Sequence, residues 1–321
     1  NIEKTKNDSL QYATKILANS LYGALANPHF RLFNIDFATA ITLTGQKVVQ
    51  FTSDKINEIF KEKFNIDSVS LYEDTDSCYV NYSQVIQKLN ILDNKKYIDF
   101  VNIFNKKYLD PYLKVQFEFF NKNLHNIEKN YFDLKREVIT IGAIFIQKKK
   151  YALYVIDEEG ITLEKPKLKV KGIEIVRSST PGYCRTKLKE IVEHIFIENS
   201  LIKTTDRVKQ INKEFKIQEV SDVAFPRGIN DLDKYIDKNG NAMKGCPIHV
   251  RAASIYNKLI IQHKLENKYE KIRDGDKIKF IYLNDNNPLK ENIIGFKEEL
   301  PKEFDYKKYI DWDLQFDKSF L

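Results

Sequence analysis

Cysteine is scarce in this sequence, and its placement excludes several kinds of protein. The 321 residues contain three cysteines, Cys78, Cys184 and Cys246, which are far apart and form no CxxC pair. A disulfide framework or a cysteine-based zinc site is therefore not expected. The same spacing fits a reducing, cytoplasm-like compartment, and we predict a cytoplasmic protein.

Long apolar runs are also missing. No stretch of 18 or more apolar residues occurs, so we predict no membrane-spanning helix and no membrane partner. The first residues, Asn1 to Asp8, are polar and provide neither a starting Met nor the apolar core of a signal peptide. Repeats and low-complexity linkers are absent as well. The opening of the chain is typical of a segment cut from something longer.

The remaining composition is that of an ordinary globular protein with a mild basic excess. Hydrophobic residues make up 42% and charged residues 30%, and the length suggests about two domains. The net charge is +7 and the isoelectric point is near 8.9. This excess suits a phosphate-bearing partner, although many basic proteins bind none.

Hydrophobic periodicity predicts two long helices at the start of the chain. Leu10, Leu17 and Leu21 fall on one face of the first, and Asn27-Pro28 ends it, because the residue before a proline avoids the helical region. The second helix is expected over residues 37–64.

The later pattern alternates between strands and helices. Two short strands at residues 68–72 and 78–82 predict a hairpin, and an aromatic-rich helix is expected over residues 97–126. Residues 132–176 are rich in β-branched runs. A mostly helical end follows, with turns at Pro226-Arg227-Gly228 and Asn239-Gly240 and a strand near residues 277–283. This order predicts an α+β fold with a separate C-terminal domain.

The predicted hairpin carries an acidic turn. Asp74 and Asp76 stand two residues apart and can converge on one divalent cation, since hard cations such as Mg²⁺ take oxygen ligands. A solvated turn is the alternative, because Asp and Thr favour turns through local hydrogen bonds. A calcium loop would need the D-x-[DN]-x-[DN]-G pattern, which is absent.

Two further patterns suggest contacts with phosphates. On the first helix Lys15, Asn19 and Tyr22 align on the face opposite the leucines, where they could hold a triphosphate and abut a base pair; the alternative is a solvent-facing polar stripe. Lys148, Lys149, Lys150 and Tyr151 introduce a strand. Lysines then alternate at positions 165, 167, 169 and 171, with a spacing in an extended strand of about 6–7 Å, comparable to the phosphate repeat. An exposed edge strand protected by lysine is the alternative.

Three of these patterns occur in an order and spacing that resemble the family B DNA polymerases. Lys15-x-x-x-Asn19-Ser20-Leu21-Tyr22-Gly23 is similar to the motif B helix, Tyr72-x-Asp74-Thr75-Asp76-Ser77 to the motif C hairpin, and Lys148-Lys149-Lys150-Tyr151 to the KxY element. The run from Lys171 to Pro181 is similar to the start of the thumb. Gly245-Cys246-Pro247-Ile248-His249-Val250-Arg251 and Phe316-Asp317-Lys318-Ser319-Phe320 most resemble polymerases of T-even-type phages.

The resemblance implies a palm with an antiparallel sheet and packed helices, followed by a mostly helical thumb. The implied boundaries are residues 1–27 for the C-terminal fingers helix, 28–172 for the palm and 173–321 for the thumb. It also implies template-directed deoxynucleotidyl transfer with two Mg²⁺ ions, with Asp76 as the main metal ligand, Asp74 as weaker support and Glu137 as a third acidic neighbour. His249 and Arg251 match the family without an assigned step.

The implied ligands follow from the same motifs. Lys15, Asn19 and Tyr22 would bind the deoxynucleoside triphosphate. The contacts with primer-template DNA would come from residues in the KxY element and at the start of the thumb, namely Lys148, Lys149, Lys150, Tyr151, Arg177, Ser178, Ser179 and Thr180.

The sequence departs from the family at several points. Glu73 replaces the usual Gly before the first motif C Asp, and the DxxSLYPS-type motif A, which supplies another metal-binding Asp, does not occur in these residues. We therefore expect inactivity alone and a partner half carrying motif A and the exonuclease. No tail follows the KSF element, so clamp binding is not expected. A phage-encoded protein would work in the host cytoplasm. The alternative function is a non-catalytic module that binds primer-template DNA.

Overall fold

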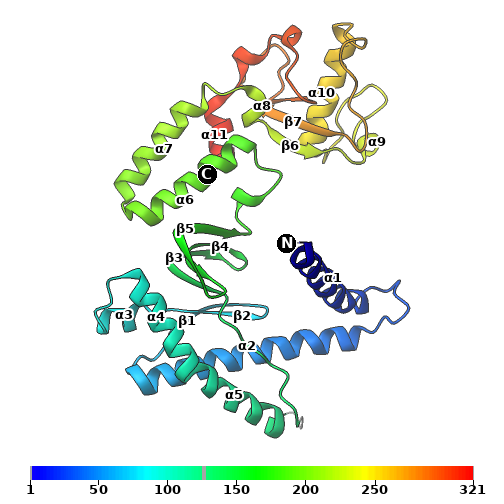
Figure 1. Cartoon of the computed structure of the whole chain (residues 1–321). Helices are drawn as coiled ribbons and strands as arrows, with labels where there is room; N and C mark the ends of the chain where they lie inside the picture. The colour runs from blue at the N-terminus through cyan, green and yellow to red at the C-terminus, as the bar shows by residue number, and fades with distance from the viewer. Residues whose placement is uncertain (1, 125–127, 321) are drawn as a thin grey trace. The chain divides into compact units, whose positions relative to one another are not determined.

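The computed structural model describes residues 2–124 and 128–320 and divides into two compact units, Asn1–Glu137 and Val138–Leu321. Helices and small antiparallel sheets alternate along the chain (Figure 1), which confirms the predicted α+β class. Within the described residues no helix is both long enough and apolar enough to cross a bilayer. The predicted domain boundaries at residues 27 and 172 stay predictions.

The first unit begins with two long helices. Helix α1 spans Ile2–Leu25 and α2 spans Ile35–Phe64, close to the predicted limits. The Asn34 side chain accepts a hydrogen bond from the Phe37 amide and so caps α2, and Asn65 ends it in the left-handed conformation. The second half of α2 buries an apolar stripe of Val49, Ile56, Ile59 and Phe60. These residues make α2 the central support of the first unit.

The hairpin and the remaining helices of this unit pack against α2. Strand β1 (Ser70–Asp74) pairs antiparallel with β2 (Ser77–Val80), as predicted, and a short helix α3 (Ser83–Lys88) follows, which the sequence pattern does not predict. Helices α4 (Asn94–Phe104) and α5 (Asp110–Phe119) are joined and followed by the π-helical turns η1 (Asn105–Leu109) and η2 (Phe120–Leu124). The predicted helix over 97–126 is thus confirmed as far as residue 124, and its last two residues lie outside the described ones.

The second unit begins with a three-stranded antiparallel sheet in the order β3-β4-β5. Its strands are β3 (Val138–Gln147), β4 (Lys150–Glu158) and β5 (Ile161–Lys171). The central strand β4 is almost wholly buried, whereas β5 is mostly exposed along the sheet edge. Residues 132–137 are irregular, so the predicted strand-rich region is shorter than expected. A 3-10 turn, η3 (Glu174–Val176), leaves the sheet.

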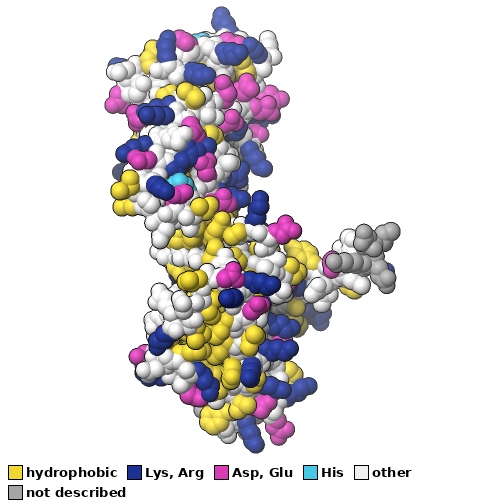
Figure 2. Space-filling view, turned by 60° about the vertical axis from the view of Figure 1, so that its left-hand side comes forward, with side chains coloured by type: hydrophobic (Ala, Val, Ile, Leu, Met, Phe, Trp, Pro, Cys, Tyr) yellow, Lys and Arg dark blue, Asp and Glu magenta, His cyan; other side chains and the backbone are white. Residues whose placement is uncertain are grey.

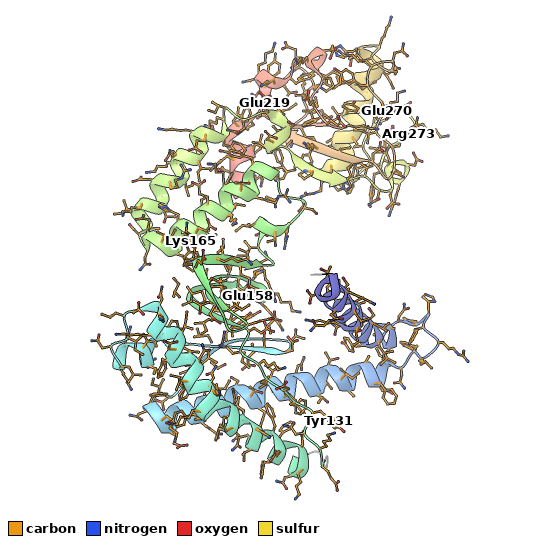
Figure 3. The ribbon with its side chains drawn as sticks, viewed as in Figure 1. Tyr131, Glu158, Lys165, Glu219, Glu270 and Arg273 are labelled. Atoms are coloured by element: carbon orange, nitrogen blue, oxygen red, sulfur yellow. The ribbon has the colours of Figure 1, made fainter. Side chains whose placement is uncertain are left out.

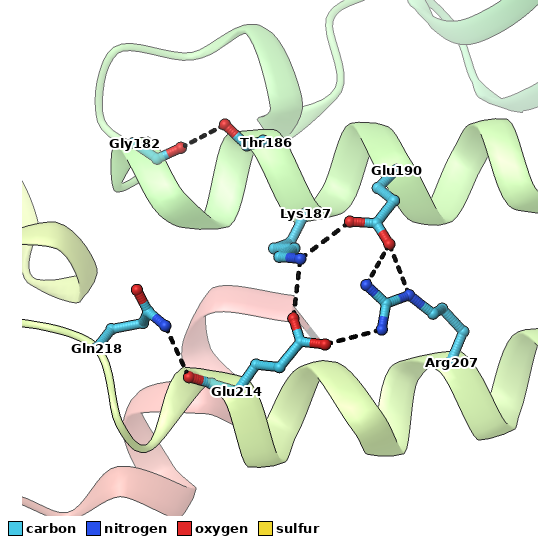
Figure 4. A network of polar contacts seen from close by, with 7 residues as sticks. All are labelled: Gly182, Thr186, Lys187, Glu190, Arg207, Glu214 and Gln218. Carbon is cyan, nitrogen blue, oxygen red and sulfur yellow. Dashed lines mark hydrogen bonds and ion pairs between the residues drawn. The ribbon is translucent and has the colours of Figure 1, made fainter.

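Two helices that follow the sheet are joined by a network of charged side chains. Helices α6 (Gly182–Glu198) and α7 (Leu201–Phe215) run side by side (Figure 4). Lys187 bridges Glu190 at 3.1 Å and Glu214 at 2.8 Å. Arg207 closes the network by donating to the same two carboxylates, at 2.9 Å for Glu214. Both cations are partly buried, and through their pairing with the two carboxylates they link α6 to α7.

The end of the chain folds around a second sheet. Strands β6 (Phe225–Gly228), β7 (Lys277–Tyr282) and β8 (Ile293–Phe296) pair in that order, accompanied by helices α8 (Val220–Val223), α9 (Leu232–Tyr235), α10 (Ile248–Gln262) and α11 (Trp312–Phe320). Two 3-10 turns, η4 (Lys302–Phe304) and η5 (Lys307–Tyr309), precede α11. The predicted turn at Pro226-Arg227-Gly228 is wrong, because these residues form β6. A proline is tolerated there since β6 is an edge strand.

Candidate functional site

The two aspartates of the predicted metal site lie at the turn between β1 and β2. Asp74 pairs with Ser77 across the hairpin, so Thr75 and Asp76 form a two-residue turn. Thr75 has a φ of 57°, which is strained for a β-branched residue. The Asp76 amide donates to the Asp74 carbonyl at 2.6 Å, and the Ser77 hydroxyl donates to the same carbonyl at 3.1 Å. These bonds hold the turn in one conformation.

The side chains of the hairpin separate onto two faces. Tyr72 pairs with Tyr79, their rings 5.6 Å apart, and Asp74 lies on the same face because side chains alternate along a strand. Glu73 pairs with Cys78 on the other face, and the Cys78 thiol donates to the Val49 carbonyl of α2. Glu73 therefore lies on the face turned to α2.

Exposure distinguishes the two aspartates. Asp76 is exposed at the tip, whereas Asp74 is half-buried and accepts a hydrogen bond from the Thr75 hydroxyl at 3.1 Å. Asp76 is thus the carboxylate that a ligand reaches first. Glu137 is exposed at the end of the unit, and the described residues include no group of three acidic, His or Cys side chains that could hold a metal. The structure therefore does not join Glu137 to the aspartates as a third ligand.

The polar stripe of α1 is solvent-accessible in this structure. Lys15 and Asn19 are exposed, and the Tyr22 hydroxyl lies 3.4 Å from the Thr42 hydroxyl of α2. The opposite, apolar face is not buried either, since Leu17 is 73% exposed. The helix therefore presents both faces, and the Tyr22 hydroxyl links it to α2.

The KxY element forms the turn between β3 and β4 in the second unit. Lys148 and Lys149 are exposed, and Lys149 adopts a φ of 63° at the turn. Tyr151 differs: its side chain is only 1% exposed, and its ring lies 5.7 Å from Phe145 and under the Lys171 ammonium at 5.8 Å. In this conformation the Tyr151 ring is covered by the Lys171 side chain, and a ligand reaches the exposed Lys148 and Lys149 before it reaches the ring.

The row of lysines on β5 is partly neutralised within the chain. Lys167, Lys169 and Lys171 alternate in regular register with β4, whereas Lys165 lies where the pairing shifts, so the predicted row of four is regular over three. Glu158 at the end of β4 pairs with Lys169 at 3.0 Å and with Lys167 at 3.7 Å; Figure 3 labels Glu158 and Lys165 on this sheet. Basic and acidic side chains are interspersed on the face of the second unit in Figure 2.

The predicted primer-contacting residues 177–180, which follow η3, form a loop held by hydrogen bonds at its end. Arg177 and Ser178 are exposed, but Thr180 is 7% exposed and its hydroxyl donates to the Glu174 carbonyl at 2.8 Å. The Ser179 carbonyl accepts a hydrogen bond from the Arg227 guanidinium at 2.7 Å. Arg177 and Ser178 thus face solvent, while Ser179 and Thr180 hold the loop.

Two residues of this region were not singled out by the sequence. Glu174 and Arg227 both hold the loop, from η3 and from the distant strand β6 respectively. Their contacts join residues up to 48 positions apart, and no spacing pattern signals such a contact. The carboxylate of Glu174 within the thumb-like run was the one local hint.

Comparison with known proteins identifies the family. The family model "DNA polymerase family B" matches residues 1–316. DNA-directed DNA polymerases of Enterobacteria phage T4 and Escherichia phage RB69 are 33% and 31% identical over 97% of this chain. A DNA polymerase of Methanocaldococcus jannaschii is 26% identical over 89% of the chain and 14% of its own length. The chain spans 36% of the length of the two phage relatives and belongs to the family B DNA polymerases.

Proposed function

We propose that this chain is the C-terminal part of a DNA-directed DNA polymerase that catalyses template-directed deoxynucleotidyl transfer. In that reaction the primer 3′-hydroxyl attacks the α-phosphate of a deoxynucleoside triphosphate, and pyrophosphate leaves. The observation that carries the proposal is the β1–β2 turn, which places the exposed Asp76 at its tip, two residues after the half-buried Asp74. A tight turn on a supported hairpin fixes a carboxylate better than a free loop does.

The donors at this turn fit Mg²⁺ in kind. Asp76 would hold the ion, and the half-buried Asp74 would support it, since carboxylate oxygens are the ligands that hard cations take. Two Mg²⁺ ions in the complete enzyme would supply electrostatic stabilisation of the charge that develops on the phosphates. The aspartates provide only part of such a site, and the remaining ligands would come from the substrate, water and a further carboxylate.

Nucleotide binding is assigned to the first helix. Lys15 would meet the triphosphate as a cation, and Asn19 and Tyr22 would line the nascent base pair. The hydroxyl contact between Tyr22 and Thr42 supports this assignment, because it holds the ring in place against α2.

Primer-template DNA would bind along the basic segments of the second unit. The exposed side chains of Lys148, Lys149, Arg177 and Ser178 would contact the backbone, where contacts position a duplex without reading its sequence. Lys150 is half-buried, and its ammonium would reach the same backbone, while Tyr151, Ser179 and Thr180 would act by holding these side chains. We assign no role in the reaction or in DNA binding to His249 and Arg251.

A second polypeptide segment is needed for the chemistry in this proposal. Motif A does not occur in these residues, so the metal-binding carboxylate that it supplies would come from the part of the polymerase that this chain does not span, together with the exonuclease. Exposed apolar side chains on α1 and α2 suit such a partner: Leu17, Phe37 and Ile41 are 73%, 62% and 50% exposed. The complex would work in the cytoplasm, that of the host if a phage encodes it.

The partner half can be tested by mixing. A polypeptide that carries motif A and the exonuclease region, produced separately, should co-elute with this chain in size-exclusion chromatography and restore primer extension. Leu17→Asp should weaken that complex, whereas the matched Asn7→Asp on the same helix should not. Co-elution that is equally strong for both variants would show that this face is not the contact.

The second candidate is a non-catalytic module that binds primer-template DNA. It is favoured by one observation, that no group of three potential metal ligands occurs within the described residues. The same mixing experiment separates the two functions. A polymerase part restores extension once motif A is supplied, whereas a binding module retains DNA affinity and yields no extension under any mixture.

A further inference from the structure

The two segments assigned to DNA are packed directly against each other within the second unit. Gly172, just after β5, has a φ of 67°, and a Cβ on it would lie 2.0 Å from the Lys149 carbonyl oxygen. No side chain fits in that space, so the backbones of the KxY turn and of the strand leading to η3 touch. The backbone of the KxY turn therefore packs directly against the segment that leads from β5 to η3.

Glu174 joins the same two segments through its side chain. Its carboxylate lies 3.1 Å from the Lys150 ammonium and 3.5 Å from the Arg177 guanidinium. Burial raises the pKa of the Glu174 carboxyl, but a hydrogen bond from its own backbone and the contact with Lys150 outweigh it, and the net pKa lies below the ordinary value. The group is thus ionised at neutral pH and can pair with both cations.

The rest of the loop is fixed at its far end. Thr180 donates its hydroxyl to the Glu174 carbonyl at 2.8 Å, and Arg227 donates to the Ser179 carbonyl at 2.7 Å. The backbone of residues 172–180 is therefore held at both ends. Among the described residues, Glu174 is the acidic residue that forms ion pairs with both Lys150 and Arg177.

We propose that Glu174 is a positioning residue for DNA binding, which holds Lys150 and Arg177 at a fixed separation so that both meet backbone phosphates. The proposal rests on the proposed DNA-binding function of these segments. In this role Glu174 contacts neither substrate nor metal, and it acts through Lys150 and Arg177.

A positioning role and a simple charge effect predict opposite results. Glu174 is an anion beside a surface assigned to phosphates, so its removal as a mere charge would strengthen DNA binding by reducing repulsion. If it orders the cations, its removal leaves them mobile and binding weakens instead. The sign of the change therefore separates the two roles.

The experiment measures primer-template affinity of the full chain by fluorescence anisotropy at several salt concentrations, for wild type and Glu174→Gln. A phosphate contact contributes a slope of about 0.9 in log K against log salt, so losing one contact should weaken binding about eightfold at about 0.1 M salt and lower the slope by about 0.9. The matched control is Glu164→Gln on β5, which removes the same charge from an exposed residue that has no ion pair with the described residues. It should bind as tightly as wild type or slightly tighter.

Rescue and coupling complete the test. Glu174→Asp, which keeps the carboxylate, should recover part of the affinity, and Lys150→Gln/Glu174→Gln should cost less than the sum of the single variants, because both remove the same contact. Thermal unfolding of Glu174→Gln close to that of wild type excludes a folding defect. Glu174→Gln that binds as tightly as Glu164→Gln, with an unchanged salt slope, overturns the positioning role. Wild type that does not bind primer-template at all overturns the DNA-binding function and this inference with it.

Discussion

Gly172 offers a test of the backbone contact that joins the two basic segments. Gly172→Ala would place a methyl group 2.0 Å from the Lys149 carbonyl oxygen and would force an L-residue to a φ of 67°. The left-handed conformation costs about 1–2 kcal/mol for a residue other than glycine. Overpacking adds about 1–3 kcal/mol, because backbone atoms rather than a flexible side chain must move. The expected loss of unfolding free energy is therefore about 2–5 kcal/mol.

Thermal unfolding followed by circular dichroism measures this loss. A destabilisation of that size should lower the melting temperature of a unit of this size by roughly 4–20 °C. Two glycines of the same unit serve as controls. Gly245→Ala meets the conformational strain alone, since its φ is 84° but its Cβ has no atom within 4 Å, and Gly228→Ala meets neither. The expected order of stability is Gly228→Ala, then Gly245→Ala, then Gly172→Ala. Equal melting temperatures for Gly172→Ala and Gly245→Ala would refute the close approach of the two backbones.

Three further outcomes are expected. The purified chain should not extend a primer with Mg²⁺ and deoxynucleotides, because a missing carboxylate ligand should cost at least about a thousandfold in rate; robust extension by a contaminant-free sample would contradict this. Its affinity for primer-template should fall steeply between about 50 and 200 mM salt, and a flat response would identify the lysines of β5 as a solvated edge. Burial, with a smaller contribution from Glu73, raises the pKa of Cys78 from 9.0 to about 11. Alkylation of Cys78 at pH 8, followed by mass spectrometry, should thus be roughly a hundredfold slower than in the unfolded chain, and equal rates would show that the thiol is not buried against α2.

The sequence predicted elements where one pattern dominates. The periodicity of α1 and α2 and the alternation of β1 and β2 were clear because each depends on residues close together in the chain. The strand β6 was missed since Pro226 and Gly228 favour a turn locally, and only its pairing with β7 makes it a strand.

The sequence predicted which residues form the candidate site, but it did not predict which residues hold them in place. The spacing of Asp74 and Asp76 indicated a shared turn, and the structure forms that turn. The burial of Tyr151 and the roles of Glu174 and Arg227 depend on packing between distant segments, which local spacing does not encode. The exposure of the apolar face of α1 was not predictable either, because its periodicity is typical of a buried helix.

The most direct test of the proposed function compares two variants of the hairpin in the reconstituted enzyme, in which a second polypeptide supplies motif A. Single-turnover incorporation of one deoxynucleotide should be nearly abolished by Asp76→Asn, because an amide in place of the exposed carboxylate weakens the magnesium site. Asp74→Asn should cost less, since that carboxylate is half-buried and already accepts a hydrogen bond. Both variants should keep their affinity for primer-template. Equal and small effects on incorporation would show that the turn is only a solvated acidic turn and would contradict the assignment of the metal site.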